Sequence, residues 1–225
     1  MKNTKEIRGL FLQESRRRLE SLGFHAKSKG PSSSSFKMSI SEDCEATVSI
    51  GFSSPPPKGV YCFYQVGPRL IQFEKILAEV TKPVTTMLPR RDDFVGTVVN
   101  NIGYLSPQNG YLMFRPETER DVPELVDEAV QLIATHGLNF VRTHSTMAQV
   151  LKYMAPNGIH GYSSPLKIVL LALCGDCEKA AILVDRDFFQ ITHFEKERLV
   201  AIGKVLLEFV ERVNLVGAEA ILAQY

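Results

Sequence analysis

The feature that most constrains this fold is a strict alternation of apolar and polar residues from Phe36 to Phe52. Apolar side chains occupy every second position on both sides of the polar pair Glu42 and Asp43. Successive side chains of a β-strand point to opposite faces, whereas a helix would spread these residues around its whole surface. The pattern therefore predicts an antiparallel hairpin with one buried face and one wet face.

Further strand patterns follow in the first half of the chain, each a short run rich in β-branched and aromatic residues. They cover residues 60–66, 94–105 and 111–115. The last two flank the turn-forming residues 106–110 and are expected to pair with each other. Helical spacing is found over residues 4–22 and after Gly67 and Pro68. About five strands, mostly antiparallel, are therefore predicted in residues 1–116.

From Asp121 onward, apolar residues recur every three or four positions, which indicates helices only. Asp121 and Glu124 have the spacing of a capping box, and Gly137 is expected to end this first helix. Pro165 is expected to open an apolar helix, and Asp176 to cap the next one. About five helices are predicted in residues 117–225.

The last helix is expected to start at Thr192 and to carry a seam of six apolar residues from Leu199 to Val216. An apolar seam of this length packs against another long structural element. It can belong to the core of the same chain or mediate self-association, so a monomer and a dimer both remain open. We predict a single α+β domain over residues 1–225, in which this seam joins the sheet half (1–116) to the helical half (117–225).

Composition excludes several classes of protein. With 44% hydrophobic and 23% charged residues, the chain is neither disordered nor a disulfide scaffold. Its apolar runs are shorter than the roughly 20 residues of a membrane helix, and charges interrupt the N-terminal segment before it reaches signal-peptide length. A net charge of +1 is not the basic excess typical of nucleic-acid binding. These features predict a cytoplasmic protein with reduced cysteines and no membrane or nucleic-acid partner.

One motif has a spacing used in redox chemistry, the pair Cys174 and Cys177. A helix N-terminus can lower the pKa of such a thiol, so a thiol oxidoreductase is one alternative. However, the chain has no Trp, and no proline follows Pro165 to take the place of the cis-proline of thioredoxin-like sites. A plain connection between two helices explains the same residues. In it, Gly175 ends one helix, Asp176 caps the next, and both cysteines fill small core positions. One pair is also only half of a zinc site, so neither metal nor cofactor is predicted.

A second alternative is a small hydrolase that uses His160 and Ser163, which lie in the Gly- and Ser-containing segment 157–164. Turn glycines and an N-cap serine account for the same residues. No nucleotide-binding glycine loop and no GxSxG elbow occurs in the chain. The sequence therefore favours an interaction protein over an enzyme.

The N-terminal region resembles a family of uncharacterised bacterial domains of unknown function. The similarity rests on Leu22-Gly23-Phe24, on Phe36 and the strand reaching Phe52, and on the later phrase His136-Gly137-Leu138-Asn139-Phe140. Proteins of this type are similar to immunity partners of bacterial polymorphic toxins, small cytoplasmic binders that mask a toxin's active site. The resemblance implies a protein partner, and it does not extend beyond Ser145.

Aromatic and arginine side chains contribute most of the binding energy in protein interfaces. Tyr104 and Tyr111 flank a predicted turn, and Arg90 and Arg91 lie on a loop bracketed by prolines. These four residues are the predicted binding interface.

Overall fold

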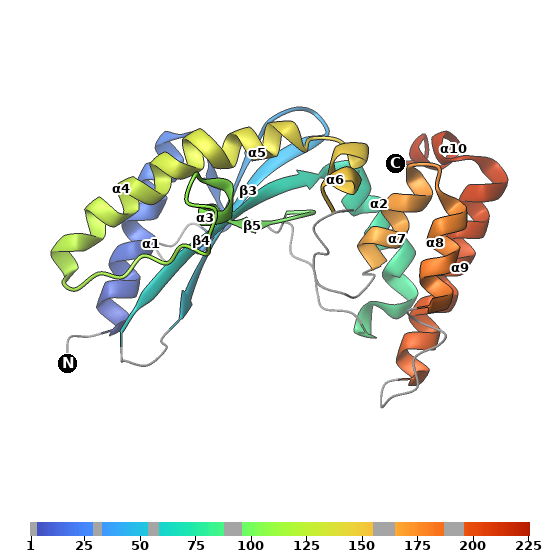
Figure 1. Cartoon of the computed structure of the whole chain (residues 1–225), viewed down its shortest axis with the longest axis horizontal. Coiled ribbons are helices and arrows are strands. Elements are labelled where there is room, and N and C mark those ends of the chain that lie inside the picture. Colours follow the sequence, from blue (N-terminus) through green and yellow to red (C-terminus); the bar gives the residue numbers. More distant parts are fainter. Residues whose placement is uncertain (1–3, 29–32, 54–58, 88–95, 155–164, 187–195) are drawn as a thin grey trace. The chain divides into compact units, whose positions relative to one another are not determined.

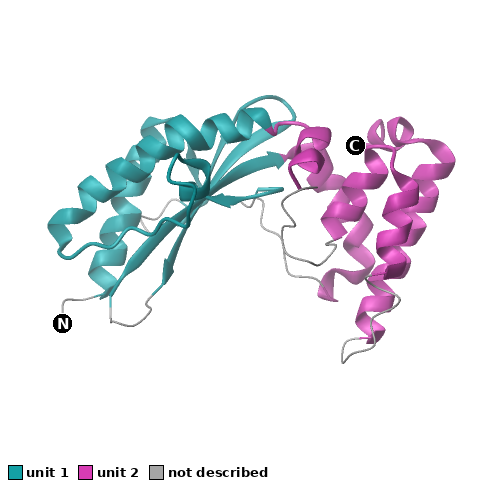
Figure 2. Cartoon of the chain, in the orientation of Figure 1, with its two compact units in different colours: residues 1–69, 92–143 teal, residues 70–91, 144–225 magenta. Residues whose placement is uncertain are grey.

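The computed structural model describes residues 4–28, 33–53, 59–87, 96–154, 165–186 and 196–225. It has the predicted α+β fold, with the sheet in the first half of the chain and most helices in the second. The chain forms two compact units, which Figure 2 distinguishes by colour. Unit 1 contains residues 1–69 and 92–143, and unit 2 contains residues 70–91 and 144–225. Each unit is therefore built from two stretches of chain, unlike the expected division at residue 116.

The sheet of unit 1 has five strands in the described part of the chain, and their order in space is their order in sequence. They are β1 (His25–Ala26), β2 (Ser35–Ser39), β3 (Cys44–Ser53), β4 (Tyr61–Leu70) and β5 (Asn100–Asn101). β2 and β3 form the predicted antiparallel hairpin, with Phe36 opposite Val48. Alternate residues of β3, from Cys44 to Ile50, are buried as the sequence indicated.

The second predicted hairpin is wrong. β5 has only two residues and pairs with β4, and the chain then turns into the short helix α3 (Ile102–Leu105). Phe114 forms an isolated bridge with Cys62 of β4. β5 and the segment around Phe114 therefore each pair with β4 and not with each other. The count of five strands is completed by β1, which pairs with β2. Gly67 and Pro68 lie within β4, so the following helix starts later than expected.

Helices of unit 1 cover one face of the sheet (Figure 1). They are α1 (Thr4–Ser21), the 3-10 turn η2 (Glu119–Asp121), α4 (Val122–Leu132), the π-turn η3 (Ile133–Gly137) and α5 (Leu138–Thr143). Side chains from both layers form the core between them, among them Phe11, Leu19, Phe36, Val48, Tyr64, Val126 and Ile133.

Two expectations about α4 are corrected. The capping box is formed by Thr118 and Asp121, not by Asp121 and Glu124. Gly137 does not end the helix, because the Leu138 N–H donates to Ile133 O and α5 continues directly from the π-turn. A Cβ atom at Gly137 would lie 3.1 Å from Val66, so glycine here lets the helix approach the sheet closely.

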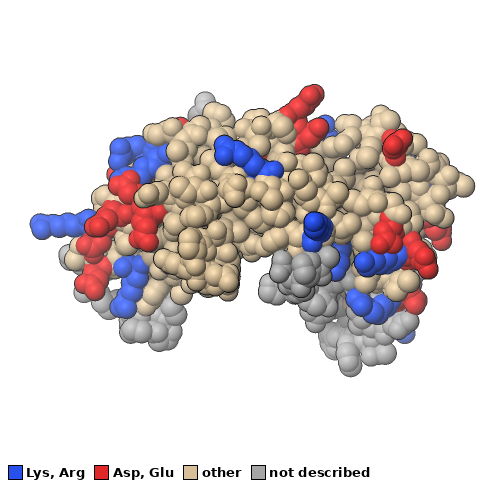
Figure 3. Space-filling view, turned by 45° about the horizontal axis from the view of Figure 1, so that its top comes forward, with Lys and Arg blue, Asp and Glu red and all other residues tan. Residues whose placement is uncertain are grey.

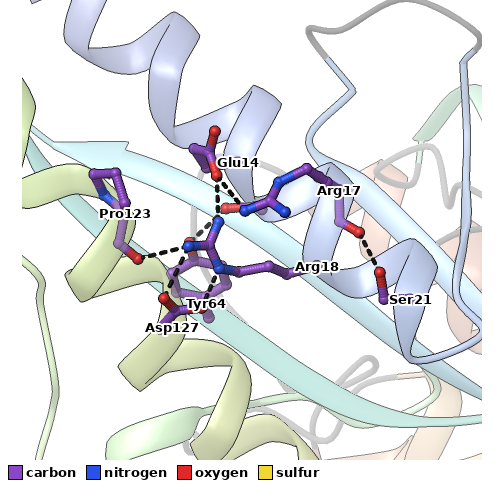
Figure 4. Close-up of polar contacts among 8 residues, drawn as sticks. Glu14, Arg17, Arg18, Ser21, Tyr64, Pro123 and Asp127 are labelled. Atoms are coloured by element: carbon purple, nitrogen blue, oxygen red, sulfur yellow. Dashed lines mark hydrogen bonds and ion pairs between the residues drawn. The ribbon is translucent and has the colours of Figure 1, made fainter.

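Arg18 links α1 to α4 through a polar cluster (Figure 4). Its guanidinium donates to Asp127 Oδ2 at 2.8 Å and to the Pro123 carbonyl at 3.2 Å, and it also pairs with Glu14. The hydrogen bonds from Arg18 hold the pKa values of Glu14 and Asp127 below their ordinary values. Charged side chains gather at this end of unit 1, over α1 and the start of α4 (Figure 3).

Unit 2 is helical. It contains α2 (Ile71–Thr81), η1 (Lys82–Met87), α6 (Met147–Met154), α7 (Pro165–Leu173), α8 (Cys177–Val184), α9 (Lys196–Val216) and α10 (Ala218–Leu222). Thr192, the predicted start of the last helix, lies outside the described residues. None of the helices described for this chain combines the length and apolarity needed to cross a membrane.

The seam of α9 belongs to the core of unit 2. Ile202, Leu206, Phe209 and Val213 are buried, and α9 packs against α2, α7 and α8. Leu199 is half-buried and Val216 is exposed, so the two ends of the predicted seam contribute less. The seam thus brings α2, from the first half of the chain, together with helices of the second half. Whether the protein self-associates stays a prediction.

Candidate protein-binding face

The predicted site residues fall into two groups. Arg90, Arg91, His160 and Ser163 lie outside the described residues. Tyr104 and Tyr111 are both half-exposed in unit 1, and their ring centroids are 6.2 Å apart in an edge-to-face arrangement. The structure therefore brings together the two aromatic residues of the predicted interface.

Asn101 holds the loop that carries both tyrosines. Its side-chain Oδ1 accepts hydrogen bonds from the N–H groups of Gly103 and Leu112, at 2.9 and 2.8 Å. Its Nδ2 donates to the Leu112 carbonyl at 3.0 Å. One buried amide thus caps α3 and fixes the returning chain next to it, which sets the positions of Tyr104 and Tyr111.

Three further features close this loop tightly. Ser106 Oγ donates to Gly103 O at 2.9 Å, and Asn109 adopts the left-handed conformation with φ of 47°. A Cβ atom at Gly103 would lie 2.2 Å from the Gly110 carbonyl oxygen, so only glycine fits at this crossing. The loop is held by specific contacts at its base, at its turn and along its length.

The row of rings continues onto the sheet. Tyr111 also contacts Phe63 of β4, with ring centroids 5.9 Å apart. Phe63 lies directly over Gly51 of the neighbouring strand, because a Cβ atom there would be 2.1 Å from the Phe63 ring. The absence of a side chain at residue 51 thus lets the Phe63 ring lie against the sheet.

Alternation along the chain extends this surface. Tyr111, Met113 and Arg115 are exposed, whereas Phe114 between them is buried. The Arg115 guanidinium lies over the Tyr61 ring, 5.5 Å from its centroid. We call this surface the aromatic face and define it by six residues, namely Tyr61, Phe63, Tyr104, Tyr111, Met113 and Arg115.

A polar cluster lies farther along β4 than Phe63. Glu45 accepts from Lys37 and from Arg69, each at 2.9 Å, which links β2, β3 and β4.

Partial burial and the neighbouring Tyr104 raise the pKa of Tyr111, so its hydroxyl keeps its proton and can donate a hydrogen bond at neutral pH. The face therefore offers rings, a hydroxyl donor and a cation.

The turn between Cys174 and Cys177 differs from a redox site. Gly175, with φ of 89°, ends α7, and Asp176 Oδ1 accepts from the Lys179 N–H and caps α8, as predicted. Cys174 is exposed, contrary to the expectation that both cysteines fill core positions. Burial raises the pKa of both thiols, and Asp176 raises that of Cys177 further. A nucleophilic thiol requires a shift in the opposite direction.

The other two cysteines are buried in unit 1. Desolvation raises the pKa of Cys44 to about 11 and that of Cys62 to about 12. None of the four cysteines is joined in a disulfide in this structure. Among the residues that the structure describes, no three His, Cys, Asp or Glu side chains are grouped closely enough to bind a metal ion.

Sequence reasoning missed Asn101, Phe63 and Gly51, which support and extend the tyrosine pair. The alternation at residues 61–65 and 111–115 could have indicated outward-facing rings, but nothing local indicates that Phe63 meets Tyr111. No protein-family model, curated protein or solved structure matches this chain. The resemblance to immunity proteins therefore stays a prediction.

Proposed function

We propose that this protein is a protein-binding module whose contact surface is the aromatic face. The observation that carries the proposal is the pair Tyr104 and Tyr111, half-exposed on a loop that the buried Asn101 side chain fixes through three hydrogen bonds. Aromatic rings held in place before binding lose little conformational entropy when they contact a partner. Tyrosine and arginine are also the residue types that most often dominate the energy of an interface.

The six residues differ in their expected contributions. Tyr111 touches both Phe63 and Tyr104, so its removal disturbs the whole row of rings. Tyr104 lies at one end of the row, and Arg115 with Tyr61 forms a separate pair. We expect Tyr111→Ala to weaken binding more than Tyr104→Ala, each by about tenfold or more.

The class of partner follows from the resemblance to immunity proteins. Within this proposal the partner is a toxin domain, and the aromatic face covers its active site. The product of a gene adjacent to the gene for this protein is the first partner to test. Its toxic activity is measured with and without one equivalent of this protein, and inhibition is the expected result.

The test of binding compares variants on the two units. Wild-type protein, the double variant Tyr104→Ala/Tyr111→Ala and the control Tyr225→Ala are used to recover partners from the native host, and the dissociation constant of a purified partner is then measured by calorimetry. Tyr225 is an exposed ring of unit 2, so its loss should leave affinity unchanged. The double variant should keep its circular dichroism and lose binding by about 100-fold. A double variant that binds as tightly as wild type contradicts the proposal.

A further inference from the structure

We infer that Tyr64 is a positioning residue for the aromatic face, which it holds through Phe114 from the opposite side of the sheet. This inference rests on the proposed function and identifies the buried contacts that keep its surface in place. Tyr64 is fully buried in β4, so its side chain cannot touch a partner. It acts through residues 111–115, which supply three of the six residues of the aromatic face.

Residues 111–115 need a contact that fixes which of their side chains face outward. Besides the Asn101 hydrogen bonds at Leu112, their backbone joins β4 in the described part of the chain through one bridge. In it, the Phe114 N–H donates to Cys62 O at 2.7 Å, and the Cys62 N–H donates to Phe114 O at 2.9 Å. A shift of the segment by one residue would turn Phe114 outward and its exposed neighbours inward. A buried site for the Phe114 ring therefore selects the observed register.

Two consecutive residues of β4 contact this segment, and their side chains point to opposite faces of the strand. The Phe63 ring meets the Tyr111 ring with 5.9 Å between centroids, and the Tyr64 ring meets the Phe114 ring with 5.7 Å between centroids. The second contact lies in the core and is edge-to-face, with an interplanar angle of 83°. Two rings prefer this arrangement to a face-to-face sandwich. The inner contact thus provides the buried site that receives Phe114.

The hydroxyl of Tyr64 ties the inner ring to α1 (Figure 4). It shares a hydrogen bond of 2.6 Å with Ser15 Oγ, and both side chains are fully buried. Ser15 lies one turn from Phe11 and one turn from Leu19 on the buried face of α1, which is otherwise apolar. A buried hydroxyl is costly without a partner, so the pair favours the orientation of the Tyr64 ring that keeps both hydroxyls bonded. In this way α1 fixes the ring that receives Phe114.

The test measures amide hydrogen exchange of the full-length protein by NMR. The variant Ser15→Ala/Tyr64→Leu removes the inner ring and leaves neither hydroxyl of the pair without its partner. The control Phe36→Leu removes an equally buried ring from β2, which β3 separates from β4. Both variants lose a core ring and are therefore destabilised. Only the first loses the contact with Phe114.

Exchange of the Phe114 N–H is compared with exchange of the amides in the β2–β3 hairpin. The ratio of the two rates should rise about tenfold in Ser15→Ala/Tyr64→Leu, since an edge-to-face contact has been lost, and should not rise in Phe36→Leu. A general loss of stability cannot raise this ratio in one variant alone. The inference is overturned if the ratio is unchanged in the Tyr64 variant or rises equally in the control.

A milder variant tests the hydroxyl pair alone. Ser15→Ala/Tyr64→Phe keeps the inner ring and removes both hydroxyls, a change that is close to neutral for stability. The exchange ratio should rise about threefold, because the ring is no longer tied to α1. An unchanged ratio in this variant would overturn the role given to Ser15.

The exchange rates are measured without a partner, so this inference and the proposed function can fail separately. With a purified partner, Ser15→Ala/Tyr64→Leu should weaken binding several-fold, and Phe36→Leu should leave it unchanged. If the exchange ratio is unchanged while Tyr104→Ala/Tyr111→Ala loses the partner, the inference is overturned and the proposed function stands. If the ratio rises but Tyr104→Ala/Tyr111→Ala binds the partner normally, the proposed function is overturned, and Tyr64 positions a surface that this partner does not use.

Discussion

Two turns of this protein carry side chains that the sequence marks as functional, and they are built differently. In unit 1, the loop from Asn101 to Leu112 is fixed by a buried side chain that bonds three backbone groups. In unit 2, the turn from Cys174 to Cys177 is fixed by backbone hydrogen bonds of the helix end and by an exposed cap, Asp176. The first turn presents two rings in contact, and the second presents two thiols with raised pKa values.

In these two turns, the position of a residue and the state of its side chain are separate requirements. Both turns have residues of a functional type in a suitable place. Only the loop of unit 1 also holds its residues in the state that the proposed function needs, because rings bind best when held rigid. The thiols would need a lowered pKa, and neither burial nor Asp176 provides it. Three predictions test this difference.

The largest effect is expected for the two side chains that hold the turns. Asn101→Ala should lower the free energy of unfolding by about 3 kcal/mol, because it leaves the buried N–H of Gly103 and the part-buried N–H and carbonyl of Leu112 without their partner. Asp176→Ala should cost about 1 kcal/mol, since it removes one exposed helix cap. Urea denaturation measures both. Equal costs would show that the Asn101 hydrogen bonds do not hold the loop.

The next effect concerns the glycine of each turn. Gly103→Ala should cost about 2 kcal/mol, because the new Cβ would meet the Gly110 carbonyl and the Leu112 side chain. Gly175→Ala should cost about 1 kcal/mol, since its surroundings are open and only its left-handed backbone opposes a side chain. Thermal and urea unfolding of the two variants rank them. The opposite ranking would contradict the close packing of the loop in unit 1.

The smallest effect is a rate. A raised pKa lowers the thiolate fraction at a given pH, so Cys174 and Cys177 should react with iodoacetamide more slowly than a cysteine peptide at pH 8. Their rates should rise as the pH increases past 9, the ordinary thiol value. Mass spectrometry of the labelled protein should find Cys44 and Cys62 modified only after unfolding. A thiol in this turn that reacts faster than the peptide would restore the oxidoreductase alternative.

The sequence predicted the elements that depend on neighbouring residues. The β2–β3 hairpin follows from alternation over two adjacent segments, and one buried face fixes its register. Asp176 and Gly175 have the roles expected of a cap and a helix end because those roles depend on local backbone geometry. Tyr104 and Tyr111 are predicted interface residues because they flank a turn, and both are half-exposed.

The sequence did not predict what depends on distant contacts. Alternation at residues 111–115 does not say which strand lies alongside. The predicted pairing with residues 94–105 is therefore wrong, and Phe114 bridges Cys62 of β4. The role of Asn101 is a contact between a side chain and backbone groups up to eleven residues away. The division into units was missed because α2 packs against α7 and α9, which follow it by more than eighty residues.

The insertion of residues 70–91 into unit 1 has a consequence for synthesis at the ribosome. β4 runs directly into α2, which therefore emerges before α7 and α9, the helices that bury Phe73, Ile76 and Leu77. Until α7 and α9 are synthesised, the nascent chain contains the apolar helix α2 without the helices that bury it. At the start of this stage, the strands that precede α2 in the sequence also lack α4 and α5. Such a stage is where a growing chain is most prone to aggregate, so chaperone binding to the nascent protein should be strongest between the emergence of α2 and that of α9.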